Sequence, residues 1–274
     1  MRDQRLAFIG GGNMAQSLIA GLLARGWPAA RISVADPVET QRNRIQAEYG
    51  VATTGDNLSA IRDADVIVLA VKPQDLADVA RQIAPALLGT APLAISVAAG
   101  VRASDVARWL GLPTVVRAMP NRPALVGYGA SALYAPAAIG AAERELASDI
   151  LAAVGLALWV DDESLMDAVT AVSGSGPAYF FLLIEMLEES GAALGLDSAT
   201  ARRLAIATAY GSARMARDTD STPAELRQQV TSKGGTTAAA LTELENAGVR
   251  DIFRRAVAAA AARSAELAEQ LSGS

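Results

Sequence analysis

The feature that most constrains the fold lies near the start of the chain, where a short apolar run passes directly into a glycine-rich turn. Leu6–Ile9 has the composition of a buried strand, and Gly10, Gly12 and Ala15 follow it in the spacing G-x-G-x-x-A. The next residues, Asn13–Arg25, have helical spacing. A strand that turns this sharply into a helix is typical of the first unit of an open α/β sheet with helices on both faces.

Each small residue of this turn has a physical role that suits a dinucleotide. Gly10 permits the tight turn, Gly12 leaves room for a pyrophosphate, and Ala15 lets the helix pack closely on the strand. Asn13 and Met14 begin the helix, whose first N–H groups and partial positive charge favour phosphate. Such turns also serve as simple tight connections, but the position between strand and helix favours binding of NADPH or NADH.

Alternating strand and helix patterns continue to about residue 160, which predicts βαβ units and a parallel sheet covered on both faces. The last two predicted strands follow Pro120–Pro123, look less regular and are candidates for antiparallel strands. The predicted strands are Leu6–Ile9, Ile32–Ala35, Asp65–Val71, Leu93–Val97, Thr114–Arg117, Ala130–Tyr134 and Ala157–Val160, and the predicted helices are Asn13–Arg25, Glu39–Glu48, Asp75–Ile83, Ala103–Leu110 and Ala141–Val154.

After Asp161-Asp162 the strand signals disappear, and Ala, Leu, Glu and Arg dominate as they do in helices. Asp197 and Thr222 suit helix N-caps, with Pro223 at the first helical position. We therefore predict a Rossmann-type nucleotide-binding domain over residues 1–161 and an all-α domain over residues 162–274. The predicted helices of the second domain are Glu163–Val172, Pro177–Leu194, Ser198–Asp218, Pro223–Val230, Thr236–Ala247 and Val249–Gln270.

One of these helices is too apolar for a small helical domain. Ala178–Leu187 (AYFFLLIEML) is apolar over nearly its whole circumference, so it must be buried on all sides. Six helices in about 110 residues struggle to bury it alone. The hypothesis is that this half packs against its copy in another subunit; the alternative is a central helix wrapped by its own domain.

Composition excludes several classes of function. The 274 residues contain no Cys and no His, which rules out zinc fingers, iron–sulfur clusters, thiolate nucleophiles and any mechanism that needs an imidazole. A net charge of −5 argues against a nucleic-acid partner. Gly, Pro or charge interrupts the apolar stretches, so no membrane segment is expected. A cytoplasmic protein without a resident metal is the simplest expectation.

Two further positions suit a cofactor. Asp36 ends the second predicted strand, where it could accept hydrogen bonds from a ribose 2′-hydroxyl and favour NADH. Arg42 and Arg44 lie nearby and could offset its charge, or they form a solvated face; Asp before Pro is also a common turn starter. Ala70–Pro73 ends a buried strand, and Lys72 there either faces phosphate or ribose or is exposed without a role.

Longer motifs extend over the whole chain, which resembles the pyrroline-5-carboxylate reductases, the enzymes of the last step of proline synthesis. The motifs Phe8–Ala15 and Ala70–Pro73 are shared among many nucleotide-binding reductases. The motifs Asp167–Ala178 and Val230–Thr237, in this order and at this distance, are specific to the family. The motifs are Phe8–Ala15 (FIGGGNMA), Ala70–Pro73 (AVKP), Ser96–Gly100 (SVAAG), Met119–Asn121 (MPN), Asp167–Ala178 (DAVTAVSGSGPA) and Val230–Thr237 (VTSKGGTT).

The resemblance implies hydride transfer from NADPH or NADH to the C=N carbon of a cyclic imino acid, with Thr237 as the hydrogen-bond partner of the ring nitrogen. It also implies a dimer of intertwined helical halves, with a pentamer of dimers as a further possibility, and a site between the two domains at the dimer interface. The implied cofactor-binding residues are Gly10, Gly12, Asn13, Met14, Asp36, Asn57, Ala70, Val71, Lys72, Pro73, Ala98, Ala99 and Gly100. The implied substrate-binding residues are Met119, Asn121, Ser173, Gly174, Ser175, Gly176, Ser232, Gly234, Gly235 and Thr236.

The chemistry of an imine fits a chain that lacks histidine. An imine is basic enough to be protonated near neutral pH, so the electrophile arrives as an iminium and needs orientation more than a strong acid. Ser232–Thr237 offers the substrate carboxylate an anion site, because two glycines let the backbone turn and the next helix presents N–H groups. The same pattern also occurs as a simple helix cap after a turn.

Three positions depart from the usual family pattern. Arg122 stands where a Thr usually follows the MPN motif, and it points either into the nicotinamide pocket or to solvent. Asp36 stands where a small or neutral residue often accepts a 2′-phosphate, so an NADPH preference is not simply inherited; we expect use of both cofactors, with NADH less penalised than in relatives without the acid. Lys233 replaces a frequent Pro.

Other readings of the sequence are weaker. A β-hydroxyacid dehydrogenase needs a catalytic lysine after the nucleotide domain, but the chain has no Lys between 72 and 233. An imine reductase for a larger ring stays open. A non-catalytic redox sensor stays open as well, although the acidic composition and the lack of a helix-turn-helix pattern argue against one.

Overall fold

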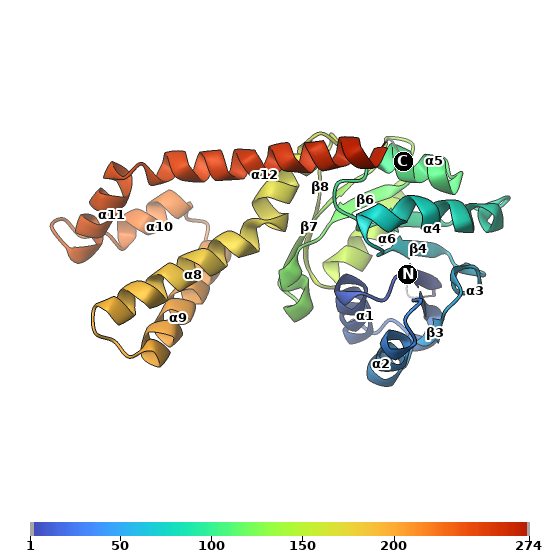
Figure 1. Ribbon diagram of the computed structural model, residues 1–274, viewed down its shortest axis with the longest axis horizontal. Coiled ribbons are helices and arrows are strands. Elements are labelled where there is room, and N and C mark those ends of the chain that lie inside the picture. The colour runs from blue at the N-terminus through green and yellow to red at the C-terminus, as the bar shows by residue number, and fades with distance from the viewer. Residues whose placement is uncertain (1–2, 273–274) are drawn as a thin grey trace. The chain divides into compact units, whose positions relative to one another are not determined.

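The computed structural model describes residues 3–272, and the first part of this chain is built on one twisted sheet (Figure 1). Within the described residues the sheet has eight strands in the order β3-β2-β1-β4-β5-β6-β7-β8. Neighbouring strands are parallel except β6 and β7, which are antiparallel. The strands are β1 (Leu6–Ile9), β2 (Ile32–Ala35), β3 (Ala52–Thr54), β4 (Val66–Leu69), β5 (Leu93–Ser96), β6 (Val116–Met119), β7 (Gly129–Tyr134) and β8 (Gly155–Trp159).

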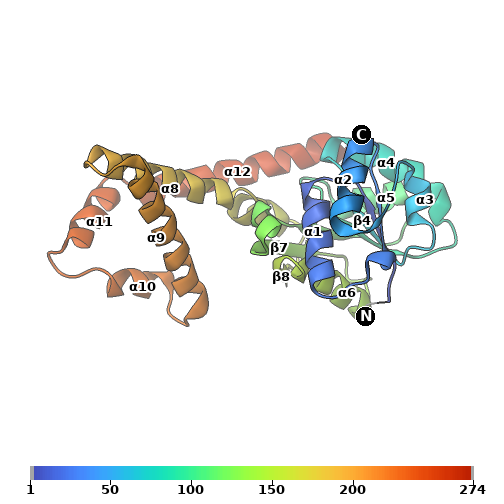
Figure 2. The same cartoon turned by 90° about the horizontal axis from the view of Figure 1, so that it is seen from below.

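Alternate residues of the strands serve two separate cores. Phe8 in β1 faces a core completed by α1 and α6, whereas Ile9 faces a core completed by α4 and α5. All four residues of β1 and of β4 are buried, as expected for central strands with helices on both faces. Figure 2 shows α4 and α5 side by side along the sheet. The helices of this part are α1 (Asn13–Ala24), α2 (Glu39–Tyr49), α3 (Asn57–Ile61), α4 (Leu76–Ile83), α5 (Ala103–Leu110), α6 (Ala141–Ala152) and α7 (Leu165–Val169).

The predicted order of strands and helices is confirmed for this part of the chain. The last two predicted strands, β7 and β8, do run opposite to the first six, because β7 is antiparallel to β6 and β8 is parallel to β7. The prediction missed β3 and α3. Three residues of β3 are too few for a clear alternation, and α3 is a five-residue helix that is fixed by a local cap: the Asp56 carboxylate accepts from Leu58 N–H and Ser59 N–H at 3.1 Å.

The described residues form two compact units, and the predicted domain boundary after residue 161 stays a prediction. Within the described residues, one unit comprises 3–175 with 260–272, and the other comprises 176–259. The first unit keeps α7 and the π-helical turn Thr170–Gly174, which follow the last strand. The Ser264 hydroxyl donates to Asp167 Oδ1 at 2.6 Å, and this bond ties the last part of α12 to α7 within the same unit.

The second unit is helical, as predicted. Its helices α8 and α9 pack side by side along their lengths (Figure 1), and Tyr179 lies edge-on to Phe253 at 6.3 Å between ring centroids. Asp197 caps α9, and Thr222 with Glu225 forms a capping box at α10, so both predicted N-caps are confirmed. The helices are α8 (Gly176–Ala193), α9 (Ser198–Asp218), α10 (Pro223–Gln229), α11 (Thr236–Asn246) and α12 (Val249–Ser272), whose last part belongs to the first unit.

The predicted apolar helix is largely uncovered. Phe180 and Phe181 are each 62% exposed, and Leu182, Leu183, Met186 and Leu187 are exposed as well. The alternative of a helix wrapped by its own domain is therefore wrong for this chain. The sequence also led us to expect no stretch long and apolar enough to span a membrane. By length and composition alone this expectation is wrong, because the helical stretch Leu165–Ala193 is long and apolar enough.

Candidate functional site

The cofactor half of the candidate site lies at the carboxyl ends of the parallel strands, where open α/β sheets hold their ligands. Gly10 follows β1 with φ +96°, and a Cβ at this residue would lie 2.7 Å from the carbonyl oxygen of Ala70. Ala70 N–H donates to Ile9 O at 2.8 Å, so the ends of β1 and β4 are held together. The glycine at position 10 is therefore required by this close approach.

The start of α1 has the features of a phosphate site. Gly12 is the N-cap, so no side chain caps the helix, and the first turn, which begins with Asn13 and Met14, has no acidic residue. A Cβ on Gly12 would meet nothing within 4 Å, so there is open space beside the free N–H groups. A pyrophosphate fits this cradle, since it brings the negative charge that the helix N-terminus lacks.

Three side chains make hydrogen bonds to the backbone of Gly11 in the glycine-rich turn. Asp36 Oδ2 accepts from Gly11 N–H at 2.9 Å, while the amides of Gln16 and Gln41 donate to Gly11 O at 2.8 and 2.7 Å. The second carboxylate oxygen, Asp36 Oδ1, accepts from Val38 N–H at 2.9 Å. Both oxygens of the predicted ribose ligand are thus engaged with the backbone. Sequence reasoning missed Gln16 and Gln41, since glutamine has no fixed place in the fingerprint.

The other predicted cofactor residues lie on neighbouring loops of the same sheet edge. Ala70, Val71, Lys72 and Pro73 follow β4, and Lys72 is exposed. Ala98, Ala99 and Gly100 follow β5, and Gly100 lies against the last part of α12, where a Cβ would be 3.6 Å from Leu267 Cβ. Asn57 opens α3, but its amide donates to Gln82 Oε1 at 2.8 Å.

The segment after β6 is fastened to the turn that precedes α8. Asn121 Nδ2 donates to Ser173 O at 3.0 Å, and Asn121 Oδ1 accepts from Ala130 N–H at 2.9 Å. A Cβ on Gly174 would lie 2.6 Å from Met119 Cε, so Met119 packs directly on this turn. Within the first unit the structure thus brings together the predicted residues Met119, Asn121, Ser173, Gly174 and Ser175.

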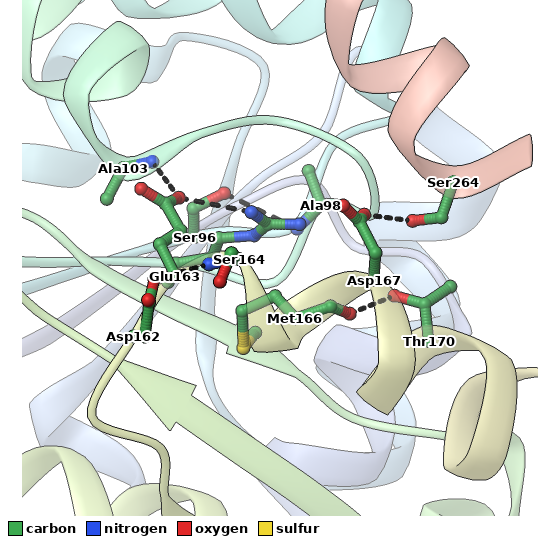
Figure 3. Close-up of polar contacts among 11 residues, drawn as sticks. Ser96, Ala98, Ala103, Asp162, Glu163, Ser164, Met166, Asp167, Thr170 and Ser264 are labelled. Atoms are coloured by element: carbon green, nitrogen blue, oxygen red, sulfur yellow. Dashed lines mark hydrogen bonds and ion pairs between the residues drawn. The ribbon is translucent and has the colours of Figure 1, made fainter. Parts of the chain in front are cut away.

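A buried ion pair, which the sequence did not reveal, supports the loop after β5. Glu163 Oε1 accepts from Ala103 N–H at 2.7 Å and pairs with Arg117 Nη1 at 3.1 Å. The side chains of Arg117 and Glu163 are only 4% and 21% exposed. Figure 3 shows Glu163 reaching Ala103 close to the contact of Asp167 with Ser264. Glu163 thus connects β6, the start of α5 and the segment before α7 within the first unit.

The remaining predicted substrate residues before and at the start of α11 lie in the second unit. Gly234 has φ +74°, and Gly235 N–H donates to Ser232 O at 3.1 Å, so the chain makes a tight turn before α11. Gly235 is the N-cap without a side-chain cap, and the first turn of α11, with Thr236 and Thr237, contains no acidic residue. The N–H groups at this helix end suit a carboxylate.

Two of the three departures from the family pattern, Arg122 and Lys233, are exposed. Arg122 begins the 3₁₀ turn Arg122–Val126 and is exposed, and Lys233 is exposed in the turn before α11. Thr237 is half-buried in the first turn of α11. Gly176 is the first residue of α8 and belongs to the second unit.

Comparisons with known proteins assign the chain to a family. Residues 163–267 match the model described as pyrroline-5-carboxylate reductase dimerisation, and residues 5–100 match NADP oxidoreductase coenzyme F420-dependent. The pyrroline-5-carboxylate reductase of Pseudomonas aeruginosa is 52% identical over 272 residues, which cover 99% of each chain. That of Vibrio alginolyticus is 40% identical and covers 97% of this chain and 98% of its own.

Solved structures agree with this assignment over nearly the whole length. A pyrroline-5-carboxylate reductase from Coxiella burnetii is 42% identical with a TM-score of 0.93, and the match covers 96% of this chain and 98% of that chain. The pyrroline carboxylate reductase of Plasmodium falciparum, solved with NADP bound, is 28% identical with a TM-score of 0.85, and covers 98% and 99%. With the fold, both helix N-termini and the sequence likeness in agreement, this chain belongs to the pyrroline-5-carboxylate reductase family.

Proposed function

We propose that the protein reduces 1-pyrroline-5-carboxylate to L-proline with NADPH or NADH. The observation that carries the proposal is that two helices of one chain begin without a side-chain cap and without an acidic residue in the first turn: α1 after Gly12 and α11 after Gly235. The reaction needs two anion sites of this kind, one for the cofactor pyrophosphate and one for the substrate carboxylate. Membership of the pyrroline-5-carboxylate reductase family supports the assignment of these two anion sites to one reaction.

The residues at the start of α11 have roles that follow from the charges of the substrate, a carboxylate and an iminium nitrogen. The N–H groups at the start of α11 and the Ser232 hydroxyl bind the carboxylate. The iminium N–H of the ring donates to the hydroxyl oxygen of Thr237, which orients the C=N bond. When bound, the reduced nicotinamide supplies the hydride that ends on the C=N carbon. The ring nitrogen then becomes a secondary amine, so no histidine is needed.

The proposal also includes the assembly and the location. We infer that the homo-oligomer is built from dimers that cover the exposed face of α8, and that five such dimers form its largest assembly. Sedimentation and light scattering test this number. We further propose that the protein works in the cytoplasm, where reduced nicotinamide cofactors are regenerated, and subcellular fractionation tests that location.

The activity is tested by following oxidation of the reduced nicotinamide after addition of 1-pyrroline-5-carboxylate, with proline measured as the product. We expect turnover in the unchanged protein and a loss of about 10²-fold or more in kcat for Thr237→Val, the range typical of a lost catalytic hydrogen-bonding group. Thr242→Val is the matched control, because Thr242 lies on the same helix and its hydroxyl donates to Ala238 O at 2.9 Å. Tight cofactor binding without any turnover would instead support a redox sensor.

A further inference from the structure

We propose that Arg42 binds the 2′-phosphate of NADPH and that Asp36 holds the glycine-rich turn, so that the protein prefers NADPH in spite of its acid after β2. This inference rests on the proposed function, since it concerns the cofactor of that same site. It reverses the expectation that Asp36 accepts the ribose 2′-hydroxyl and favours NADH.

The hydrogen bonds of Asp36 turn its carboxylate toward the protein backbone. Oδ2 accepts from Gly11 N–H and Oδ1 accepts from Val38 N–H, both at 2.9 Å. The turn lies so close that a Cβ on Gly11 would be 3.2 Å from Asp36 Oδ2 and 2.5 Å from Ile45 Cδ1. A carboxylate that accepts two backbone N–H groups has part of its charge compensated, so it repels a nearby phosphate less than a free carboxylate would.

The guanidinium of Arg42 is held at the same edge of the sheet. Its Nη1 donates to Asp36 O at 2.8 Å and to Pro37 O at 3.0 Å. A Cβ on Gly55 would lie 3.4 Å from Nη1 and 3.8 Å from Nη2, so the guanidinium also lies against the loop after β3. Arg42 is half-buried and, among the described residues, has no acidic ion-pair partner.

The position and charge of the Arg42 guanidinium suit the binding of a phosphate. Two carbonyl oxygens fix one nitrogen, and the remaining N–H groups are left for a bidentate contact, for which guanidinium geometry is well suited. In nucleotide-binding sheets the 2′-phosphate lies beside the end of the second strand, which is β2 here, and an arginine nearby accommodates it. A side chain larger than that of Gly55 would start in van der Waals contact with the guanidinium.

Arg44 offers a matched control on the same helix. It is exposed and pairs with Glu48 at 3.5 Å, so its charge already has a partner. Both arginines lie on α2 and carry the same charge, but only Arg42 is anchored at the end of β2. A general loss of positive charge therefore affects both variants equally, whereas a specific phosphate contact affects Arg42 alone.

The test measures binding of adenosine 2′,5′-bisphosphate and of adenosine 5′-monophosphate to the protein by calorimetry, without substrate. We expect Arg42→Ala to weaken the bisphosphate about 10–100-fold, the effect of one lost charge-assisted contact, and to change the monophosphate less than about twofold. Arg44→Ala should change neither. Equal losses for both ligands, or none for the bisphosphate, would overturn the role of Arg42.

The role of Asp36 is tested with Asp36→Asn. Because an amide has only one acceptor oxygen, the variant keeps one of the two backbone contacts, and we expect it to weaken NADPH and NADH alike by loosening the turn. A loss confined to NADH, with improved binding of NADPH, would show a ribose ligand and overturn the assignment. These binding results stand apart from turnover, so failure of the reductase proposal and failure of this inference are distinguishable.

Discussion

At the residue scale, the glycines of the turn after β1 differ in their surroundings: a Cβ on Gly10 would lie 2.7 Å from Ala70 O, whereas a Cβ on Gly12 would meet nothing within 4 Å. Gly10 and Gly12 lie where the fingerprint requires them, since backbone geometry alone determines their roles. Asp36, Asn57 and Asn121 make hydrogen bonds within the protein, and their predicted contacts with ligands stay a prediction. A polar side chain can satisfy either role, and only the distances between elements decide which.

The two glycines of the turn should respond to alanine in opposite ways. Gly12→Ala has room for its Cβ and an ordinary φ of −66°, so we expect a melting temperature close to the unchanged protein. Its cofactor affinity should fall at least about 10-fold, because the methyl group occupies the space that a pyrophosphate needs. Gly10→Ala, with φ +96° and a 2.7 Å contact to Ala70 O, should lower stability by roughly 1–3 kcal/mol.

Thermal unfolding and cofactor titration of both variants check this pair. A Gly12→Ala protein that binds NADPH normally would contradict the assignment of the α1 N-terminus as the phosphate site. A Gly10→Ala protein as stable as the parent would contradict the close approach of β1 and the loop after β4.

At the scale of elements, strands and helices with strong periodicity were predicted to within a few residues, whereas the short β3 and α3 were not. The predicted helix Glu163–Val172 is divided into α7 and a π-helical turn, Thr170–Gly174. Tertiary contacts hold both ends of this segment: the Asn121 amide donates to the Ser173 carbonyl, and Glu163 pairs with Arg117. No local pattern encodes such contacts, because their partners are distant in the sequence.

The buried pair of Arg117 and Glu163 predicts a non-additive effect on stability. Glu163→Leu leaves a buried guanidinium without its acid, which should cost roughly 3–5 kcal/mol. The double variant Arg117→Met with Glu163→Leu should be more stable than Glu163→Leu alone, because both charges are then removed. Urea unfolding of the two single variants and the double variant measures the coupling; additive losses would contradict a pair that interacts in the folded state.

At the scale of the whole molecule, the second unit has an apolar surface that one chain leaves exposed. Phe180 and Phe181 of α8 lie within the residues that match the dimerisation family. The sequence predicted this surface correctly, since a helix that is apolar all round needs cover on all sides. It could not give the number of chains in the assembly, because that number depends on contacts between dimers.

A charge on α8 should therefore separate the subunits. Phe181 is 62% exposed in one chain, so Phe181→Glu replaces an apolar group with a charge on each side of a twofold interface formed by α8, and we expect the dimer dissociation constant to rise at least about 100-fold. Leu88→Glu is the control, because Leu88 is 80% exposed but belongs to the nucleotide-binding unit. Analytical ultracentrifugation reads the result, and an unchanged dimer in Phe181→Glu would show that α8 is not part of the interface.

The reduction itself is tested most directly by the fate of an isotopic label. The protein is supplied with 1-pyrroline-5-carboxylate and NADPH that carries two deuterium atoms at C4 of the nicotinamide, and the proline formed is analysed by mass spectrometry and NMR. The account predicts one deuterium per proline, on the ring carbon that was doubly bonded to nitrogen. Proline without deuterium, or with deuterium at another carbon, would contradict direct hydride transfer to the imine.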